Sequence, residues 1–281
     1  MPTVQVEDGT LWYEETGTGP PLVCLHGAWQ DHRSWDAQVE RFADEYRVIT
    51  VDFRGHGSTG PTTSQSYSVE MFVDDLEAVM SSLGVERPIL IGNSMGGMVI
   101  QSYLDRHPAA ARGAVIGGPL RTMPPVEMPT VTKQLFSPIP FLTGMLETVG
   151  TKATYGSLLD STRLVNGGPW LTLNDRVRDA AMQAVATTSA SEFRKTFRAL
   201  YEFESPTLSH VSTPVFVVYG DHETALIKRQ GDHLAKTVRS GTVLEVDDSG
   251  HLVNQDRPEE FNDSIASFFA GLPSATVPGN V

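Results

Sequence analysis

The chain has 281 residues, 40% of them hydrophobic and 20% charged, which is an ordinary composition for a soluble globular protein. That length suits one large α/β domain with a sizeable insertion, or two small domains. The formal net charge of −13 argues against nucleic acids, polyanions and anionic membrane surfaces as partners, because those partners require clustered Lys and Arg.

The single cysteine, Cys24, excludes an internal disulfide framework. The N-terminal segment 1–9 lacks the basic and apolar regions of a signal peptide. No apolar run approaches the roughly 20 residues that cross a bilayer. We therefore expect a cytoplasmic protein.

The first predicted element is a hairpin. Residues 3–7 and 11–15 alternate apolar and polar side chains around Asp8-Gly9, a pair typical of tight turns, so we expect antiparallel strands there. Short apolar runs, predicted to be strands, follow at residues 22–25, 48–51, 89–91, 114–116, 215–219 and 243–246. Helical patterns lie between them at residues 34–43, 69–83, 95–106, 229–238 and 258–270. This alternation indicates a mostly parallel sheet with helices on both faces.

The alternation stops between residues 119 and 206. Only helical patterns occur there, at residues 132–136, 141–149, 151–164, 175–187 and 191–201. We therefore predict a helical cap at residues 119–206, inserted into a core domain of residues 1–118 and 207–281.

Ser94 is the predicted nucleophile. It lies in Gly92-Asn93-Ser94-Met95-Gly96-Gly97, where a predicted strand meets a predicted helix. Gly-x-Ser-x-Gly at such a junction is typical of a nucleophile elbow, a turn too tight for neighbouring side chains. The turn lifts the hydroxyl clear of the sheet and places it at a helix N-terminus, where unpaired N–H groups favour negative charge.

A serine nucleophile requires a base and a third group that orients the base. His251 lies between the strand at residues 243–246 and the helix at 258–270, so we predict that it is the base. Two carboxylates, Asp221 and Glu223, follow the strand at residues 215–219, and either could accept the imidazole N–H.

An oxyanion hole requires two backbone donors. We predict the amide of Met95, which follows the nucleophile, and the amide of Ala28, in the turn after residues 22–25. The substrate contacts that we predict are all apolar side chains: Trp29, Met123, Phe136, Phe141, Met145 and Leu252.

The segment Gly55-His56-Gly57-Ser58-Thr59-Gly60 matches the Gly-x-Gly-x-x-Gly pattern of dinucleotide sites. No helix is predicted until about residue 69, so the helix N-terminus that would bind a phosphate is missing. The histidines show no ligand spacing typical of a metal site. We expect neither a nucleotide cofactor nor a metal.

Five segments resemble the α/β-hydrolase fold superfamily, over about residues 3–270: LHGAW, VDFRGHGSTG, GNSMGG, VVYGDHE and GHLVNQDRPEEF. The resemblance implies a mostly parallel eight-stranded sheet with helices on both faces and a helical cap after the sixth strand. It also implies that the acid lies three residues after the glycine that ends the seventh strand. That position is Glu223, where most relatives have Asp, so Glu223 is preferred and Asp221 is the alternative.

The resemblance further implies acyl transfer through an acyl-enzyme at Ser94. We expect a carboxylic ester hydrolase that also accepts lactones, and the soft apolar cap favours a small or medium hydrophobic group in the substrate. The alternatives are a cofactor-free perhydrolase and a hydrolase of carbon–carbon bonds. GNSMGG resembles the latter group, but HGAWQDHRSW lacks its glycine- and proline-rich extension. A non-enzymatic module that senses small molecules is the alternative from another class. The sequence does not determine the oligomeric state.

Overall fold

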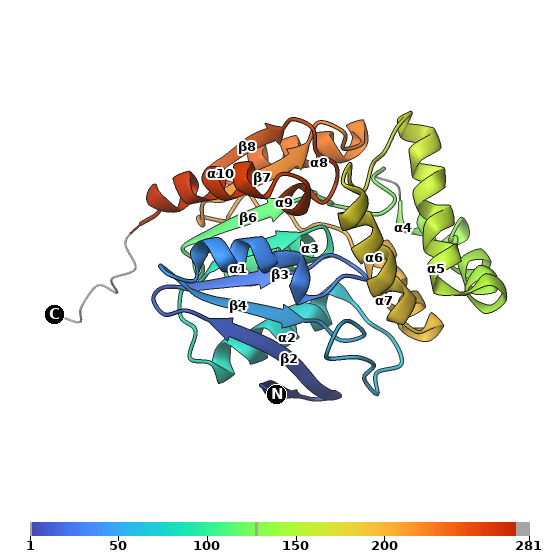
Figure 1. Ribbon diagram of the computed structural model, residues 1–281, viewed down its shortest axis with the longest axis horizontal. Helices are drawn as coiled ribbons and strands as arrows, with labels where there is room; N and C mark the ends of the chain where they lie inside the picture. Colours follow the sequence, from blue (N-terminus) through green and yellow to red (C-terminus); the bar gives the residue numbers. More distant parts are fainter. Residues whose placement is uncertain (1, 127–128, 274–281) are drawn as a thin grey trace.

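The computed structural model describes residues 2–126 and 129–273, and within them one eight-stranded sheet has the order β1-β2-β4-β3-β5-β6-β7-β8 (Figure 1). The strands are β1 Thr3–Val6, β2 Gly9–Thr16, β3 Pro21–Leu25, β4 Arg47–Asp52, β5 Ile89–Asn93, β6 Gly113–Gly117, β7 Val215–Gly220 and β8 Gly241–Val246. The strand β2 pairs antiparallel with β1 and β4, and all other neighbours are parallel. The predicted fold class is therefore confirmed.

A 3₁₀ turn, His32–Trp35, leads into the first helix. The helices are α1 Asp36–Phe42, α2 Val69–Ser82, α3 Met95–Arg106, α4 Thr130–Leu135, α5 Ile139–Asn166, α6 Asp175–Thr187, α7 Ala190–Glu202, α8 Ala225–Thr237, α9 Val253–Asp256 and α10 Pro258–Ala270. The helix predicted at residues 229–238 begins earlier, at Ala225, because the hydroxyl of Thr224 accepts a hydrogen bond from the amide of Ile227 and caps it. No helix in the described part of the chain is long and apolar enough to cross a membrane.

The central strands are buried on both faces, so their alternate side chains supply two separate cores. In β3, Val23 and Leu25 belong to the core that also contains the buried residues of α2, α3 and α8, whereas Leu22 and Cys24 belong to the core that contains those of α1 and α10. The strands β5, β6 and β7 divide in the same way. Continuous apolar runs in the sequence therefore correspond to strands covered by helices on both sides.

The helices α4–α7 lie together beyond the carboxyl ends of the parallel strands (Figure 1). All four fall within the predicted cap; residues 127–128 of the cap, and residues 1 and 274–281 of the predicted core domain, lie outside the described part. Inside α5, Gly150 has φ 80° and ψ 173°, which breaks the helix between the two segments predicted at 141–149 and 151–164.

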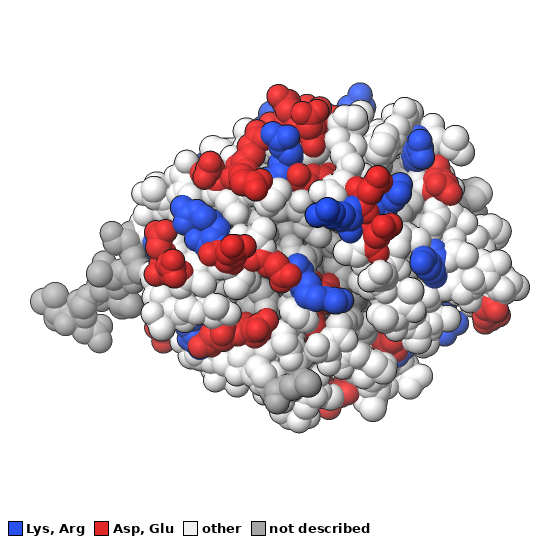
Figure 2. Space-filling model, in the orientation of Figure 1, with Lys and Arg blue, Asp and Glu red and all other residues white. Residues whose placement is uncertain are grey.

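Acidic and basic side chains are interspersed over the face shown in Figure 2, and no basic patch dominates that face. Most of the exposed large apolar residues lie on or beside α4 and α5. They include Val131, Leu135, Phe136, Phe141, Leu164 and Val165.

Candidate active site

Ser94 stands between β5 and α3 with φ 53° and ψ −111°, a backbone conformation that residues with side chains rarely adopt. Only glycine fits at the flanking positions, because a Cβ there would collide with neighbouring backbone atoms. A Cβ on Gly92 would lie 2.4 Å from the carbonyl carbon of Gly96, and a Cβ on Gly96 would lie 2.1 Å from the carbonyl oxygen of Leu25. The amide of Ser94 donates to the carbonyl oxygen of Gly117 in β6, at 2.9 Å, and so fixes the turn.

His251 and Glu223 form a buried hydrogen-bonded pair. Nδ1 of His251 lies 2.5 Å from Oε2 of Glu223. A carboxylate can only accept, so in the neutral imidazole Nδ1 carries the proton and Nε2 is left as an acceptor. The other carboxylate oxygen, Oε1, accepts from the amide of Thr224 at 2.8 Å and from the indole Nε1 of Trp170 at 2.5 Å. Three donors therefore fix the orientation of this carboxylate.

Asp221, the alternative acid, has different partners. Its Oδ1 accepts from the amide of Ser249 at 3.1 Å, and its side chain is 30% exposed. Burial works against the charged form, but hydrogen bonds from the amides of Ser249 and Asp248 outweigh it and lower the pKa of Asp221. Asp221 thus ties β7 to the loop that precedes His251, while Glu223 contacts the imidazole.

The turn after β3 brings a second backbone segment toward Ser94. A Cβ on Gly27 would lie 3.5 Å from Cβ of Ser94. The buried His26 braces this turn, because its Nε2 accepts from the amide of Phe53 at 3.1 Å. Ala28 follows and lines the same cavity as Ser94, and Met95 is the first residue of α3.

That cavity has a volume of about 260 Å³, and both Ser94 and His251 line it. Gly118, in the loop after β6, has φ 50°, and a Cβ there would lie 2.8 Å from Cε1 of His251. Loops after β3, β5, β6, β7 and β8 therefore converge at the carboxyl edge of the sheet, which is where open α/β sheets bind ligands.

A family model of the alpha/beta hydrolases matches residues 22–264. The chain belongs to the alpha/beta hydrolase family. An epoxide hydrolase 3 of Xenopus tropicalis is 22% identical over 94% of this chain and 76% of its own length. A non-heme haloperoxidase of Rhodococcus erythropolis is 27% identical over 88% of this chain and 90% of its own. The structure of an esterase from Thermogutta terrifontis superposes with a TM-score of 0.79 at 21% identity, over 95% of this chain and 97% of that one.

Three of the predicted substrate contacts of this alpha/beta hydrolase, namely Trp29, Met123 and Leu252, line the cavity with Ser94. Phe136 lines a neighbouring cavity. Phe141 and Met145 are in neither lining, and Phe141 is 73% exposed. The reason is helical geometry: the buried face of the first half of α5 carries Leu142 and Leu146, so the residues one position earlier point elsewhere.

Several lining residues were not predicted. The second half of α5 contributes Tyr155, Leu158, Leu159 and Thr162, and α7 contributes Phe197 and Leu200. Their spacing, i, i+3, i+4 and i+7, is that of one helix face and was readable from the sequence. Trp170 lies in the connection between α5 and α6, where no periodicity marks it.

The glycine-rich segment 55–60 folds back on the protein itself. The amide of Gly55 donates to Gly60 O at 2.7 Å, and a Cβ on Gly57 would lie 2.2 Å from Oδ2 of Asp52. The helix that follows, α2, begins only at Val69. Among the described residues no group of His, Cys, Asp or Glu could hold a metal ion.

The connection between α5 and α6 is attached to the loop that carries His251. The amides of His251 and Leu252 donate to the carbonyl oxygens of Trp170 and Leu171, at 2.8 and 2.9 Å. Asp256 accepts from the amide of Gly250 at 2.8 Å and from the amide of Leu173 at 3.1 Å. A part of the cap is thereby built into the site.

Proposed function

We propose that this chain is a serine hydrolase of carboxylic esters, including their cyclic forms, the lactones. Ser94 acts as nucleophile, His251 as base and Glu223 as the acid that orients it. The observation that supports this best is the 2.5 Å contact between Glu223 and His251, in the loops around a strained, glycine-flanked serine.

In the proposed mechanism, His251 Nε2 accepts the hydroxyl proton as Ser94 Oγ bonds to the carbonyl carbon. The amides of Met95 and Ala28 donate to the resulting oxyanion, and each such donor typically lowers the barrier by about 3 kcal/mol. His251 returns the proton to the leaving alcohol, and the acyl group stays on Ser94. A water molecule then loses a proton to His251 and attacks the acyl carbon. His251 gives that proton to Ser94 Oγ as the bond between the acyl carbon and Oγ breaks, which releases the acid and restores the serine.

The names of the relatives describe enzymes that catalyse other reactions, among them an epoxide hydrolase and a haloperoxidase. Attack of a serine on an epoxide would leave an ether, which has no carbonyl for water to attack, so this proposed site favours acyl substrates. Hydrogen peroxide in place of water would convert the same acyl-enzyme to a peracid, and perhydrolysis is therefore an alternative outcome of the deacylation step.

The test compares Ser94→Ala with Ser102→Ala, because Ser102 lies on α3, the helix that follows Ser94, and is buried to a similar degree. We expect Ser94→Ala to lower kcat for p-nitrophenyl butyrate by at least about 10⁴-fold and to abolish labelling by a fluorophosphonate. Ser102→Ala should keep both. Full activity in Ser94→Ala would contradict the proposal, and stoichiometric ester binding without turnover by the unsubstituted protein would favour the sensing module.

A further inference from the structure

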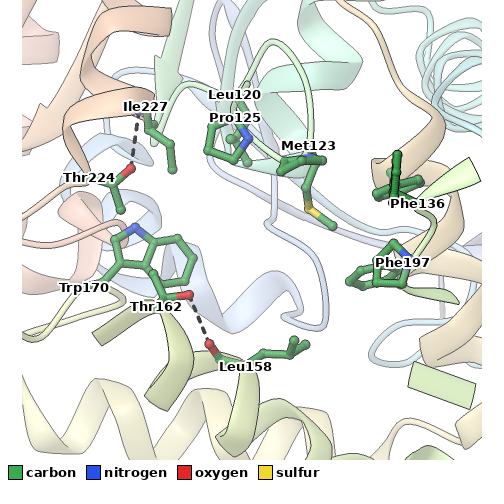
Figure 3. A pocket seen from close by; sticks show the side chains of 13 residues that line it. Leu120, Met123, Pro125, Phe136, Leu158, Thr162, Trp170, Phe197, Thr224 and Ile227 are labelled. Atoms are coloured by element: carbon green, nitrogen blue, oxygen red, sulfur yellow. Dashed lines mark hydrogen bonds between the residues drawn. The ribbon is translucent and has the colours of Figure 1, made fainter. Parts of the chain in front are cut away.

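A second, larger cavity adjoins the one at Ser94. Its volume is about 440 Å³, against about 260 Å³ for the first. The two cavities share the lining residues Leu120, Met123, Leu158, Thr162, Trp170 and Phe197. Figure 3 shows these side chains arranged around a common space, with Phe136 and Ile227 on opposite sides of it. We name this larger cavity, which extends to Phe136 and Ile227, the outer chamber.

The outer chamber offers a ligand almost no polar partner. None of its described lining residues is Asp, Glu, Lys, Arg or His. Thr162 donates to Leu158 O at 3.0 Å, Tyr201 donates to Lys133 O at 2.7 Å, and Thr224 accepts from the amide of Ile227 (Figure 3). The indole N–H of Trp170 is engaged by Glu223. Each of these polar groups already has a hydrogen-bond partner within the protein, so the chamber presents mainly hydrocarbon.

The cavity at Ser94 is small for a complete substrate site. Pockets that bind small molecules usually measure roughly 300–1,000 Å³, and the first cavity reaches that range only together with the outer chamber. An ester whose carbonyl lies at Ser94 would therefore extend its apolar part past the lining residues that the two cavities share, and into the outer chamber.

We propose that the outer chamber binds a long hydrocarbon chain of the substrate, so that the preferred substrates are esters with an extended acyl or alcohol chain rather than short ones. This proposal rests on the proposed function, because it places the ester group at Ser94. Each methylene buried in the chamber should raise kcat/KM about fourfold, which corresponds to ~0.8 kcal/mol per methylene.

The first experiment measures kcat/KM for two series of straight-chain esters below their critical micelle concentrations. One series runs from p-nitrophenyl acetate to p-nitrophenyl dodecanoate, and the other consists of acetates of increasingly long alcohols. We expect a continuous rise in at least one series to a length well beyond butyl. A maximum at a variable chain of four carbons or fewer in both series would contradict the proposed role of the outer chamber while leaving the proposed hydrolase function intact. The absence of turnover for every ester would instead contradict the proposed function.

The second experiment uses two neighbouring, similarly exposed cap residues. Phe136 is 73% exposed and lines the outer chamber, whereas Leu135 is 77% exposed and is not in its lining. Both positions are open to solvent, so both should tolerate aspartate. Phe136→Asp should lower the ratio of kcat/KM for dodecanoate to that for acetate by roughly fivefold or more, because a carboxylate at the wall repels a hydrocarbon chain. Leu135→Asp should leave the ratio unchanged. Equal ratios in the two variants would contradict the proposal.

A different set of contacts carries a second inference, about Trp170. Its indole N–H donates to Oε1 of Glu223 at 2.5 Å, and its ring centroid lies 4.7 Å from that of His251. Its carbonyl oxygen accepts from the amide of His251. A single residue of the cap thus contacts both partners of the proposed catalytic pair.

We infer that Trp170 is a positioning residue for the catalytic acid. A glutamate has one more rotatable bond than an aspartate, so more conformational freedom must be removed to orient it. The indole N–H and the amide of Thr224 hold Oε1, and this leaves Oε2 directed at the imidazole. The inference depends on Glu223 being the acid of the proposed mechanism.

The test is a double-mutant cycle with Trp170→Phe, which keeps an aromatic ring and removes the N–H. In the protein that retains Glu223, the substitution should lower kcat for p-nitrophenyl acetate about tenfold and change KM less than twofold. In a Glu223→Ala background it should change kcat less than twofold, since the acceptor is gone. An equal loss in both backgrounds would show a purely structural role of Trp170 and would contradict the inference. If Glu223→Ala does not fold, Glu223→Asp replaces it, because the shorter side chain withdraws the carboxylate from the indole.

Discussion

At the residue scale, Ser94 carries a strained backbone. A positive φ at a non-glycine residue costs on the order of 1–3 kcal/mol, and the structure retains it because the amide of Ser94 is held by Gly117 of β6. In this conformation Ser94 lines the cavity at the start of α3. The strain is therefore tied to the residue on which the proposed chemistry depends.

His32 is a titratable residue outside the site with a defined electrostatic role. Burial disfavours its charged form, but the hydrogen bond and the charge of Asp52 outweigh burial and raise the pKa of His32 above its ordinary 6.5. Nδ1 of His32 lies 2.9 Å from Oδ2 of Asp52, which is fully buried. The folded protein therefore binds the proton more tightly than the unfolded chain does.

This pKa shift predicts a pH-dependent stability. The contribution of protonated His32 is complete below pH 6.5 and is lost as the pH rises through the raised pKa. Urea unfolding of wild type and His32→Gln should therefore differ more at about pH 6 than at about pH 9. The control is His233→Gln, on the exposed side of α8. A difference that grows with pH would contradict this assignment.

At the scale of elements, the junction of β5 and α3 is held by backbone packed against backbone. Gly96 sits on the first turn of α3, directly against Leu25 at the end of β3. The helix can approach the sheet this closely only because the side chain is missing. The junction therefore has no room for even one methyl group.

Two glycine substitutions should act in opposite directions. Gly96→Ala should lower the free energy of unfolding by about 1–3 kcal/mol or more, because the new Cβ meets a backbone oxygen that cannot move away. Gly144→Ala, in the interior of α5 with no atom within 4 Å of the new Cβ, should raise it by about 0.5–1 kcal/mol. Chemical denaturation of both variants measures these changes. Equal effects at the two positions would refute the proposed backbone contact.

On the scale of the whole molecule, the cap is attached to the core by buried polar contacts as well as by apolar packing. Glu192 of α7 accepts a hydrogen bond from the hydroxyl of Tyr67 in the core and pairs with Lys195 at 2.8 Å. A Cβ on Gly55 would lie 2.8 Å from Oε2 of Glu192, so this glycine of the segment 55–60 makes room for the cap carboxylate.

Tyr67→Phe tests this attachment. The substitution removes a donor from a buried carboxylate, and we expect it to lower the free energy of unfolding by about 1–3 kcal/mol. Tyr103→Phe is the matched control, because Tyr103 is also buried but lies on α3, with its ring against His107. Proteolysis within α4–α7 should accelerate in Tyr67→Phe only. Identical stability of Tyr67→Phe and wild type would rule out a role for this hydrogen bond in holding the cap.

Much of this protein follows from local patterns in its sequence. The apolar runs predict the central strands, because a strand that is buried on both faces has no polar side. The glycines around Ser94 predict the tight turn between β5 and α3, because only a residue without a side chain fits at the positions that flank Ser94. The break at Gly150 and the helix stripe at Tyr155, Leu158 and Thr162 are likewise local, since they depend on one residue's φ or on the period of one helix.

Tertiary structure alone decided which side chains meet. Asp221 and Glu223 are two residues apart on one loop, and only the position of His251, 28 residues further along the chain, distinguishes their partners. The indole of Trp170 reaches Glu223 across 53 residues, and Tyr67 reaches Glu192 across 125. Such contacts arise when separate elements pack, and no periodicity of 2 or 3.6 residues encodes them. The outer chamber has the same origin, because residues of α5, α7 and α8 form it together with Phe136, Trp170 and the segment 120–125.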